Sequence, residues 1–303
     1  MKKALIIALL VPFSLGTIAI PALGQATEQS QVSLEDQENA QERINFSGKL
    51  RMLSQRIPSA ACHLSRGIDT DGSKALLVGA AAEFEKILTA LEFGDTDLNI
   101  QNAETRRMTL AKIHELHEKW TPLKNAADAV AGGTATDAEF SYILTENMPV
   151  LAAAQLVVEE LVQQYSNPNA VTRASLMLVD ISGRQRMLTQ KVSKETCILG
   201  GDNQTPETLS DIEGTIRIFE ASLEALRFGM PAVGVGPPPN PEISAGLEGV
   251  LADWQSVRPL LSDILAGDAL SDAANVQKFQ GLNTTMANMN TVVGMYGQAA
   301  GTN

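Results

Sequence analysis

The sequence has 303 residues, of which 35 are acidic and 23 basic, so its formal net charge is −12 at pH 7. This acidic balance argues against nucleic acid or an anionic membrane surface as a partner. Aromatic residues make up only 4% of the chain, and apolar residues recur every three or four positions rather than every second one, which favours an all-α fold.

The start of the chain has the pattern of a secretory signal peptide over residues 1–24. Lys2-Lys3 precedes an apolar run over 4–20, and small residues at 22–24 offer a cleavage site. An uncleaved membrane anchor is the alternative. No later stretch is long and apolar enough to span a bilayer, so we expect a soluble protein in a bacterial periplasm, with no stable membrane insertion after the signal is cleaved.

The remainder of the chain is an internal duplication. Residues 44–57 return as 179–192, and residues 84–94 return as 219–229, both at a spacing of 135 residues. A period of this length indicates duplicated domains rather than a solenoid of short units.

Turn-forming residues divide each copy into four segments with helical periodicity. Clusters of Gly, Pro, Asn and Asp occur at 69–72, 132–133, 167–168, 200–203 and 234–241. The predicted helices are 34–66, 75–93, 104–131, 137–165, 169–199, 206–228, 242–266 and 272–299. We therefore predict an all-α fold of two tandem four-helix bundles related by internal pseudo-two-fold symmetry, over residues 30–166 and 167–303.

The first helix of each copy carries two stripes. In copy 1 an apolar stripe steps by three and four residues and predicts packing into the helix's own bundle: Phe46, Leu50, Leu53, Ile57, Ala60 and Leu64. A second stripe, rotated by about 100°, holds small and polar residues with one arginine. Its members are Ser47, Arg51, Ser54, Gln55, Pro58 and Cys62, matched in copy 2 by Ser182, Arg186, Thr189, Gln190, Ser193 and Cys197. We predict that this second stripe meets the other copy.

Parallel packing of the two first helices would place Arg51 and Arg186 opposite each other. Two guanidinium groups about 7 Å apart repel by roughly 2 kcal/mol at an effective dielectric near 20, and an anion between them reverses the sign. A planar oxyanion fits the guanidinium fork. Flanking candidates, which can donate hydroxyls or allow close backbones, are Ser47, Gly48, Ser182 and Gly183; secondary candidates are Gln55, Gln190, Arg56 and Lys191. The alternative is that each arginine pairs with a buried glutamate of its own bundle.

Both first helices are locally basic within an acidic protein. Residues 45–68 and 181–194 each carry four Lys or Arg residues and no carboxylate. For the outer residues, ordinary surface ion pairs with acidic helices are as good an explanation as an anion site; these are Lys49, Arg66, Arg184 and Lys194.

The two cysteines occupy equivalent positions. Cys62 follows Arg51 by 11 residues and Cys197 follows Arg186 by 11, which returns each to nearly the same helical face about 16 Å along the axis. In an oxidising compartment this placement predicts a Cys62–Cys197 disulfide; two buried thiols are the alternative.

Other chemical motifs are weak. His114 and His117 lie one turn apart and could hold a metal, but no further ligand has matching spacing, so a solvated polar face is the better interpretation. No phosphate loop, nucleophile motif or cofactor motif is present. We therefore expect no metal, no cofactor and no enzyme activity.

The duplicated segment resembles a known receptor motif. Ile44-Asn-x-Ser-Gly-x-x-Arg-Met-x-Ser-x-Arg is similar to the P-box of the periplasmic sensor domains of NarX/NarQ-type nitrate and nitrite receptor kinases, and of the related PilJ-type N-terminal domains of type IV pili chemotaxis transducers. In that family the domain is a four-helix bundle that dimerises through its first helix, and the arginine before the methionine binds nitrate at the interface. The resemblance assigns this role to Arg51 and Arg186.

These observations together predict a periplasmic binding protein for a small inorganic oxyanion, with nitrate or nitrite favoured. The chain carries no membrane helix, kinase or methyl-accepting domain, so we expect it to report to a membrane-bound sensor kinase or methyl-accepting chemotaxis receptor. The alternative function is a ligand-free interaction module of a chemotaxis or type IV pilus signalling assembly.

Overall fold

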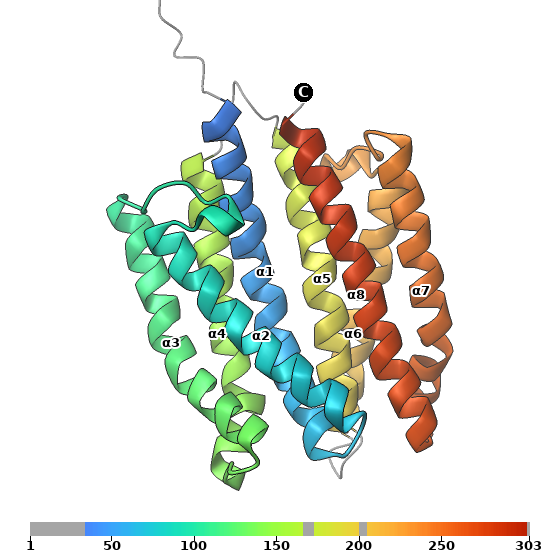
Figure 1. Ribbon diagram of the computed structural model, residues 1–303. Coiled ribbons are helices and arrows are strands. Elements are labelled where there is room, and N and C mark those ends of the chain that lie inside the picture. The colour runs from blue at the N-terminus through green and yellow to red at the C-terminus, as the bar shows by residue number, and fades with distance from the viewer. Residues whose placement is uncertain (1–33, 166–172, 200–204, 302–303) are drawn as a thin grey trace, which may run out of the picture. The chain divides into compact units, whose positions relative to one another are not determined.

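The computed structural model describes residues 34–165, 173–199 and 205–301. Within these ranges the chain forms eight α-helices and no β-strand. They are α1 (Leu34–Ser65), α2 (Thr70–Phe93), α3 (Arg107–Gly132), α4 (Asp137–Tyr165), α5 (Arg173–Leu199), α6 (Pro206–Phe228), α7 (Pro241–Leu265) and α8 (Asp272–Gly301), with short 3-10 helices η1 (Thr96–Leu98) and η2 (Pro231–Val233). Helices α1–α4 pack as one four-helix bundle and α5–α8 as a second (Figure 1). The predicted all-α fold of tandem bundles is confirmed.

The predicted helix ends agree with the structure to within three residues, with one exception in the described ranges. Helix α2 begins at Thr70 rather than at residue 75. Asp69 takes a left-handed conformation with φ 44°, and its carbonyl accepts a hydrogen bond from the amide of Ser73 at 2.7 Å. The segment predicted as a turn is therefore the first turn of the helix. The predicted signal peptide and the boundary at 167–168 lie outside the described residues.

The turn after the second helix is repeated in both copies. Gly94 ends α2 with φ 83°, and Gly229 ends α6 with φ 79°. A Cβ atom at Gly94 would also lie 2.9 Å from the carbonyl oxygen of Asn102. Left-handed backbone and close approach both require glycine at this position.

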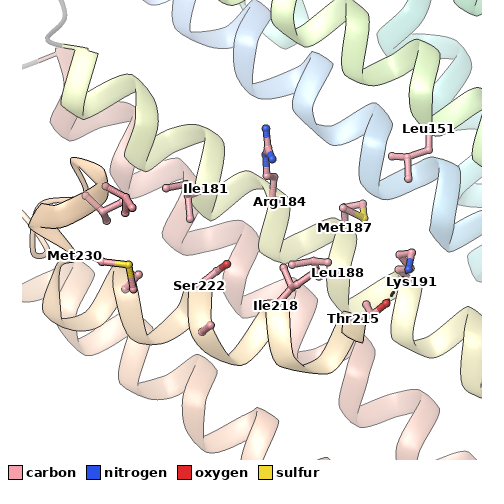
Figure 2. A pocket seen from close by; sticks show the side chains of 14 residues that line it. Leu151, Ile181, Arg184, Met187, Leu188, Lys191, Thr215, Ile218, Ser222 and Met230 are labelled. Atoms are coloured by element: carbon pink, nitrogen blue, oxygen red, sulfur yellow. Dashed lines mark hydrogen bonds between the residues drawn. The ribbon is translucent and has the colours of Figure 1, made fainter. Parts of the chain in front are cut away.

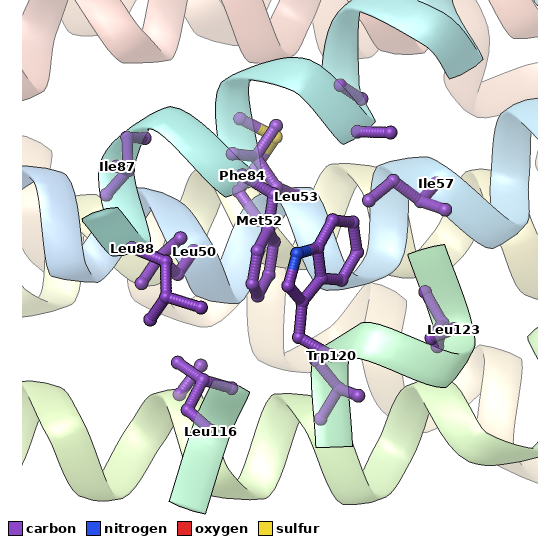
Figure 3. Close-up of a cluster of buried hydrophobic side chains, with 14 of the residues drawn as sticks. Leu50, Met52, Leu53, Ile57, Phe84, Ile87, Leu88, Leu116, Trp120 and Leu123 are labelled. Atoms are coloured by element: carbon purple, nitrogen blue, oxygen red, sulfur yellow. The ribbon is translucent and has the colours of Figure 1, made fainter. Parts of the chain in front are cut away.

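Each bundle core contains the same aromatic pair. Trp120 stacks on Phe84 with ring centroids 4.0 Å apart, and Trp254 lies 4.1 Å from Phe219. All four side chains are buried. Figure 3 shows Trp120 and Phe84 among the leucines of α1 and α3 in the first bundle. The equivalence of the pairs shows that the duplication preserves the bundle core as well as the repeated motif of the first helices.

Helices α1 and α5 join the two bundles. They lie side by side with the most extensive contact of any helix pair in the described ranges (Figure 1). The hydroxyl of Ser59 donates to that of Ser193 at 2.8 Å, and Cys62 and Cys197 form a disulfide with Cα atoms 6.2 Å apart. Residues of equal height are thus neighbours, so the two helices run parallel. The second, polar stripe is buried here because it faces the other copy.

Candidate anion-binding site

Arg51 of α1 and Arg186 of α5 meet at the junction of the two bundles. Their side chains are almost fully buried, with 2% and 1% of their surface exposed. A Cβ atom built on Gly48 would lie 3.4 Å from Nη2 of Arg51 and 3.5 Å from Nη2 of Arg186, and one on Gly183 would lie 3.4 and 3.6 Å from the same two atoms. Both guanidinium groups therefore occupy one narrow space that the two glycines leave open.

The two arginines have equivalent hydrogen-bond partners. Nη1 of Arg51 donates to Oε1 of Gln155 on α4 at 2.8 Å and to Oδ1 of Asp180 on α5 at 2.9 Å. Nη1 of Arg186 donates to Oδ1 of Asn290 on α8 at 2.7 Å and to Oδ1 of Asn45 on α1 at 3.2 Å. Each arginine is thus held by one residue from its own bundle and one from the first helix of the other.

The remaining edge of each guanidinium group has spare donors. The buried Nε atom of both arginines lacks a hydrogen-bond partner in the described part of the chain. Arg51 donates to both Gln155 and Asp180 from Nη1, and Nη2 of Arg186 makes one long contact, 3.3 Å to the carbonyl oxygen of Asn45. The Nε–Nη2 edge is the one that grips planar oxyanions through two parallel hydrogen bonds.

Positive charge is incompletely compensated at this junction. Burial, together with the neighbouring Arg51 cation, lowers the pKa of Arg186 to about 9. Burial also lowers the pKa of Arg51, although Asp180 opposes that shift. Of the described residues, Asp180 is the one carboxylate that bonds to either arginine, and it comes from the other copy. The predicted alternative, a glutamate of the same bundle, is wrong.

Ser47 and Ser182 are placed beside the arginines, but their hydroxyl protons are already used. Ser47 donates to the carbonyl oxygen of Ile44 and Ser182 to that of Val179, each at 3.0 Å. The prediction that these hydroxyls donate to an anion does not describe this conformation. Serine commonly bonds the carbonyl one turn back when it lies within a helix.

The glutamines of the secondary set lie farther along the same interface. Oε1 of Gln55 accepts from the ammonium of Lys194 at 2.7 Å, and that ammonium also donates to Asn147 at 2.9 Å. Oε1 of Gln190 accepts a hydrogen bond from Nε of Arg56 at 3.3 Å. The side-chain amides of Gln55 and Gln190 are thus hydrogen-bonded to other residues of this interface rather than to the two arginines.

Lys191 does not join the arginines. Its ammonium donates to Thr215 of α6 at 2.7 Å and pairs with Glu195 at 2.6 Å. Figure 2 shows it on the wall of a separate, largely apolar cavity of about 540 Å³ between α5 and α6. The prediction that Lys191 belongs to the anion site is wrong, because its side chain points toward α6 of its own bundle.

The outer cations divide between two environments. Lys49 pairs with Glu83, and Arg184, half exposed, pairs with Asp180 at 3.0 Å, as expected for surface ion pairs. Lys194 is instead 4% exposed, and burial lowers its pKa to about 8. The surface interpretation is therefore wrong for Lys194.

The histidine pair on α3 has a simpler role. Nε2 of His114 lies 2.9 Å from a carboxylate oxygen of Glu92 in an exposed contact. Within the described ranges no group of three or more His, Cys, Asp or Glu is arranged to hold a metal ion.

Four residues of the site were not predicted from the sequence. Asn45 and Asp180 are one equivalent pair, and Gln155 and Asn290 are another. Each pair shows the 135-residue spacing of the duplication. Polar residues that recur at the 135-residue spacing, on the first helix and on the fourth helix of each copy, were the signal that could have identified them.

The chain matches the family described as type IV pili methyl-accepting chemotaxis transducer N-term, PilJ, over residues 32–141 and again over 173–279. The chain belongs to this family. One match falls in each bundle and ends within the fourth helix of that bundle, so the PilJ domain is present as a tandem duplication. No curated protein shows a significant match to the chain.

Membership in the PilJ family places the protein among sensing or signalling domains. Such domains are non-enzymatic parts of methyl-accepting chemotaxis transducers and are typically periplasmic, which supports a membrane receptor context. None of the helices in the described ranges combines the length and apolar character needed to cross a bilayer.

Proposed function

We propose that this PilJ-type protein senses a small oxyanion, nitrate or nitrite first, bound between Arg51 and Arg186. Its occupancy is read by a membrane-bound sensor kinase or methyl-accepting chemotaxis receptor. One observation carries the proposal: two buried guanidinium groups share a narrow space, and their Nε atoms have no partner in the described part of the chain.

An anion would satisfy both the charge and the hydrogen bonds. Buried cations without full compensation are costly, and each charge-assisted hydrogen bond to an oxyanion contributes on the order of 1.5–3 kcal/mol before association costs. Nitrate and nitrite are planar and can accept from both forks at once. The resemblance to NarX/NarQ receptors supports the same assignment.

Binding at this point also offers a signal. The anion draws α1 and α5 together at the level of the arginines, because it replaces repulsion by attraction. The Cys62–Cys197 disulfide holds the same two helices about 16 Å farther along their axes. Anion binding therefore changes the distance between α1 and α5 at the level of the arginines, while the disulfide keeps their distance constant at the other end.

Isothermal titration calorimetry with nitrate, nitrite and chloride at constant ionic strength tests the proposal. We expect wild-type protein to bind nitrate or nitrite, and Arg51→Ala and Arg186→Ala each to lose at least tenfold in affinity. Arg258→Ala is the matched control, because Arg258 of α7 pairs with Glu220 of α6 at 2.7 Å, away from the junction. Equal heats for wild type and both junction variants would contradict the proposal.

The second candidate is a ligand-free interaction module. It is favoured by Phe93 and Phe228, which end α2 and α6 at equivalent positions and are both 64% exposed. Exposed aromatic side chains are typical of protein interfaces. This function predicts thermal stability that is indifferent to anions, and loss of a co-purifying membrane receptor when both phenylalanines are changed to serine.

A further inference from the structure

The pseudo-symmetry of the arginine pair is broken at one charge. Arg51 is bonded by Asp180, whereas the equivalent partner of Arg186 is Asn45. The partners from α4 and α8, Gln155 and Asn290, are both neutral amides. The two halves of the site thus differ by one carboxylate and are otherwise alike in the kind of group that they present.

The charge at the junction follows directly. Two guanidinium cations and one carboxylate leave a net charge of +1. Arg184 also contacts Asp180, but its side chain is 50% exposed and is screened by water. Glu83, which acts on Arg186, is paired with Lys49, and Glu159, which acts on Arg51, is exposed. Water screens Arg184, Lys49, Glu83 and Glu159, so the net charge is counted over Arg51, Arg186 and Asp180.

We infer that the Asn45/Asp180 pair sets the charge of the ligand, so that the site takes a monovalent planar oxyanion and discriminates against divalent anions such as sulfate. This inference rests on the proposed anion site between Arg51 and Arg186.

The physical reason is charge matching in a buried space. A monovalent anion brings the junction to neutrality. A divalent anion leaves an excess negative charge beside Asp180, whose side chain is 27% exposed, so the like-charge repulsion is stronger there than in bulk water. The ligand is held chiefly by Arg186, because Arg51 already has a carboxylate.

The net charge of +1 depends on the duplication within one chain. Two identical subunits around a two-fold axis must carry the same residue at this position. In such a homodimer, the two arginines and their partners have a net charge of +2 if both partners are asparagine, or zero if both are aspartate. A tandem chain can carry one of each, which a homodimer of identical copies cannot.

Four proteins test the inference: wild type, Asp180→Asn, Asn45→Asp, and the double exchange Asn45→Asp/Asp180→Asn. Affinities for nitrate and sulfate are measured by calorimetry at constant ionic strength, and folding of each protein is checked by circular dichroism. Asp180→Asn gives Arg51 an amide partner of the kind that Arg186 already has, so we expect it to fold.

Wild type should prefer nitrate to sulfate. In Asp180→Asn the ratio of sulfate to nitrate affinity should rise at least tenfold. In Asn45→Asp nitrate affinity should fall at least tenfold. The double exchange should return the ratio to within about threefold of wild type, because the net charge is again +1.

The two proposals fail in distinguishable ways. If wild type binds nitrate through both arginines but Asp180→Asn keeps the wild-type ratio, the inference about charge selection is overturned and the anion site stands. A double exchange that does not recover the ratio overturns it equally. If wild type binds neither anion, the proposed site fails and takes the inference with it.

Discussion

Replacing Gly48 by alanine separates the anion site from the stability of the fold. The added methyl would lie 3.4 and 3.5 Å from the Nη2 atoms of Arg51 and Arg186, which is ordinary van der Waals contact. An oxyanion that accepts from Nη2 must come to about 2.9 Å of the same atoms. The methyl and the anion therefore compete for one space, while the fold itself can accommodate the methyl.

The expected magnitudes have opposite signs. Alanine is favoured over glycine inside a helix by about 1 kcal/mol, so Gly48→Ala should unfold no more easily than wild type without anion. Nitrate at ten times its dissociation constant should stabilise wild type by about 1.4 kcal/mol. For a protein of this size that corresponds to a rise in Tm of roughly 2–3 °C. Gly48→Ala should lose most of this rise.

The assay is thermal unfolding followed by circular dichroism, with nitrate exchanged for an inert anion at constant ionic strength. Gly79→Ala is the matched control, because Gly79 is an exposed position of α2 with nothing within 4 Å of its added Cβ atom. It gains the same helix propensity but should keep the full anion response. A full anion response in Gly48→Ala would refute the reasoning, since the space beside the guanidinium groups would then not be the binding site.

Three other predictions concern stability. The double variant Cys62→Ser/Cys197→Ser should lose up to about 5 kcal/mol in urea unfolding, because the disulfide closes a loop of 135 residues; reductant should destabilise wild type by the same amount and leave the variant unchanged. Phe84→Ala should cost about 3–5 kcal/mol because its ring is fully buried on Trp120, whereas Phe93→Ala, 64% exposed, should change stability by less than about 0.5 kcal/mol. Burial lowers the pKa of His63 to about 3, so the unfolded chain binds the proton more readily and stability falls as pH drops below 6.5. Between pH 6.5 and 4.5 wild type should lose on the order of 2–3 kcal/mol more than His63→Phe, which keeps the stacking on Phe279 but cannot titrate; parallel pH profiles would contradict this.

Local chemistry explains why much of the fold was predictable. Helix periodicity and turn residues act over a few positions, so the helix ends in the described ranges could be predicted closely from the sequence. The start of α2 is the exception, because the helix begins directly after Asp69. The register of the duplication then indicated that Arg51 and Arg186 are equivalent. The predicted parallel pairing followed from a polar stripe that the helix's own bundle could not use.

The direction of individual side chains was less predictable. Spacing along a helix assigns a face, but Lys191 lies near the border between two faces and turns toward Thr215. Ser47 and Ser182 lie on the expected face, yet each hydroxyl bonds its own helix. Such choices depend on which acceptor is nearest once the helices have packed, and short-range sequence patterns do not contain that distance.

The sequence by itself determined the two bundles, their equivalence and the pair of arginines, because these depend on periodicity and on a repeated register. Only the tertiary structure decided that Asp180 bonds Arg51 across the junction while Asn45 bonds Arg186, and that both Nε atoms face no partner among the described residues. The physical reason is that the electrostatic free energy of a buried charge depends mainly on the groups within a few ångströms of it. Those groups come from four helices that are far apart along the chain and meet only when the two copies pack together.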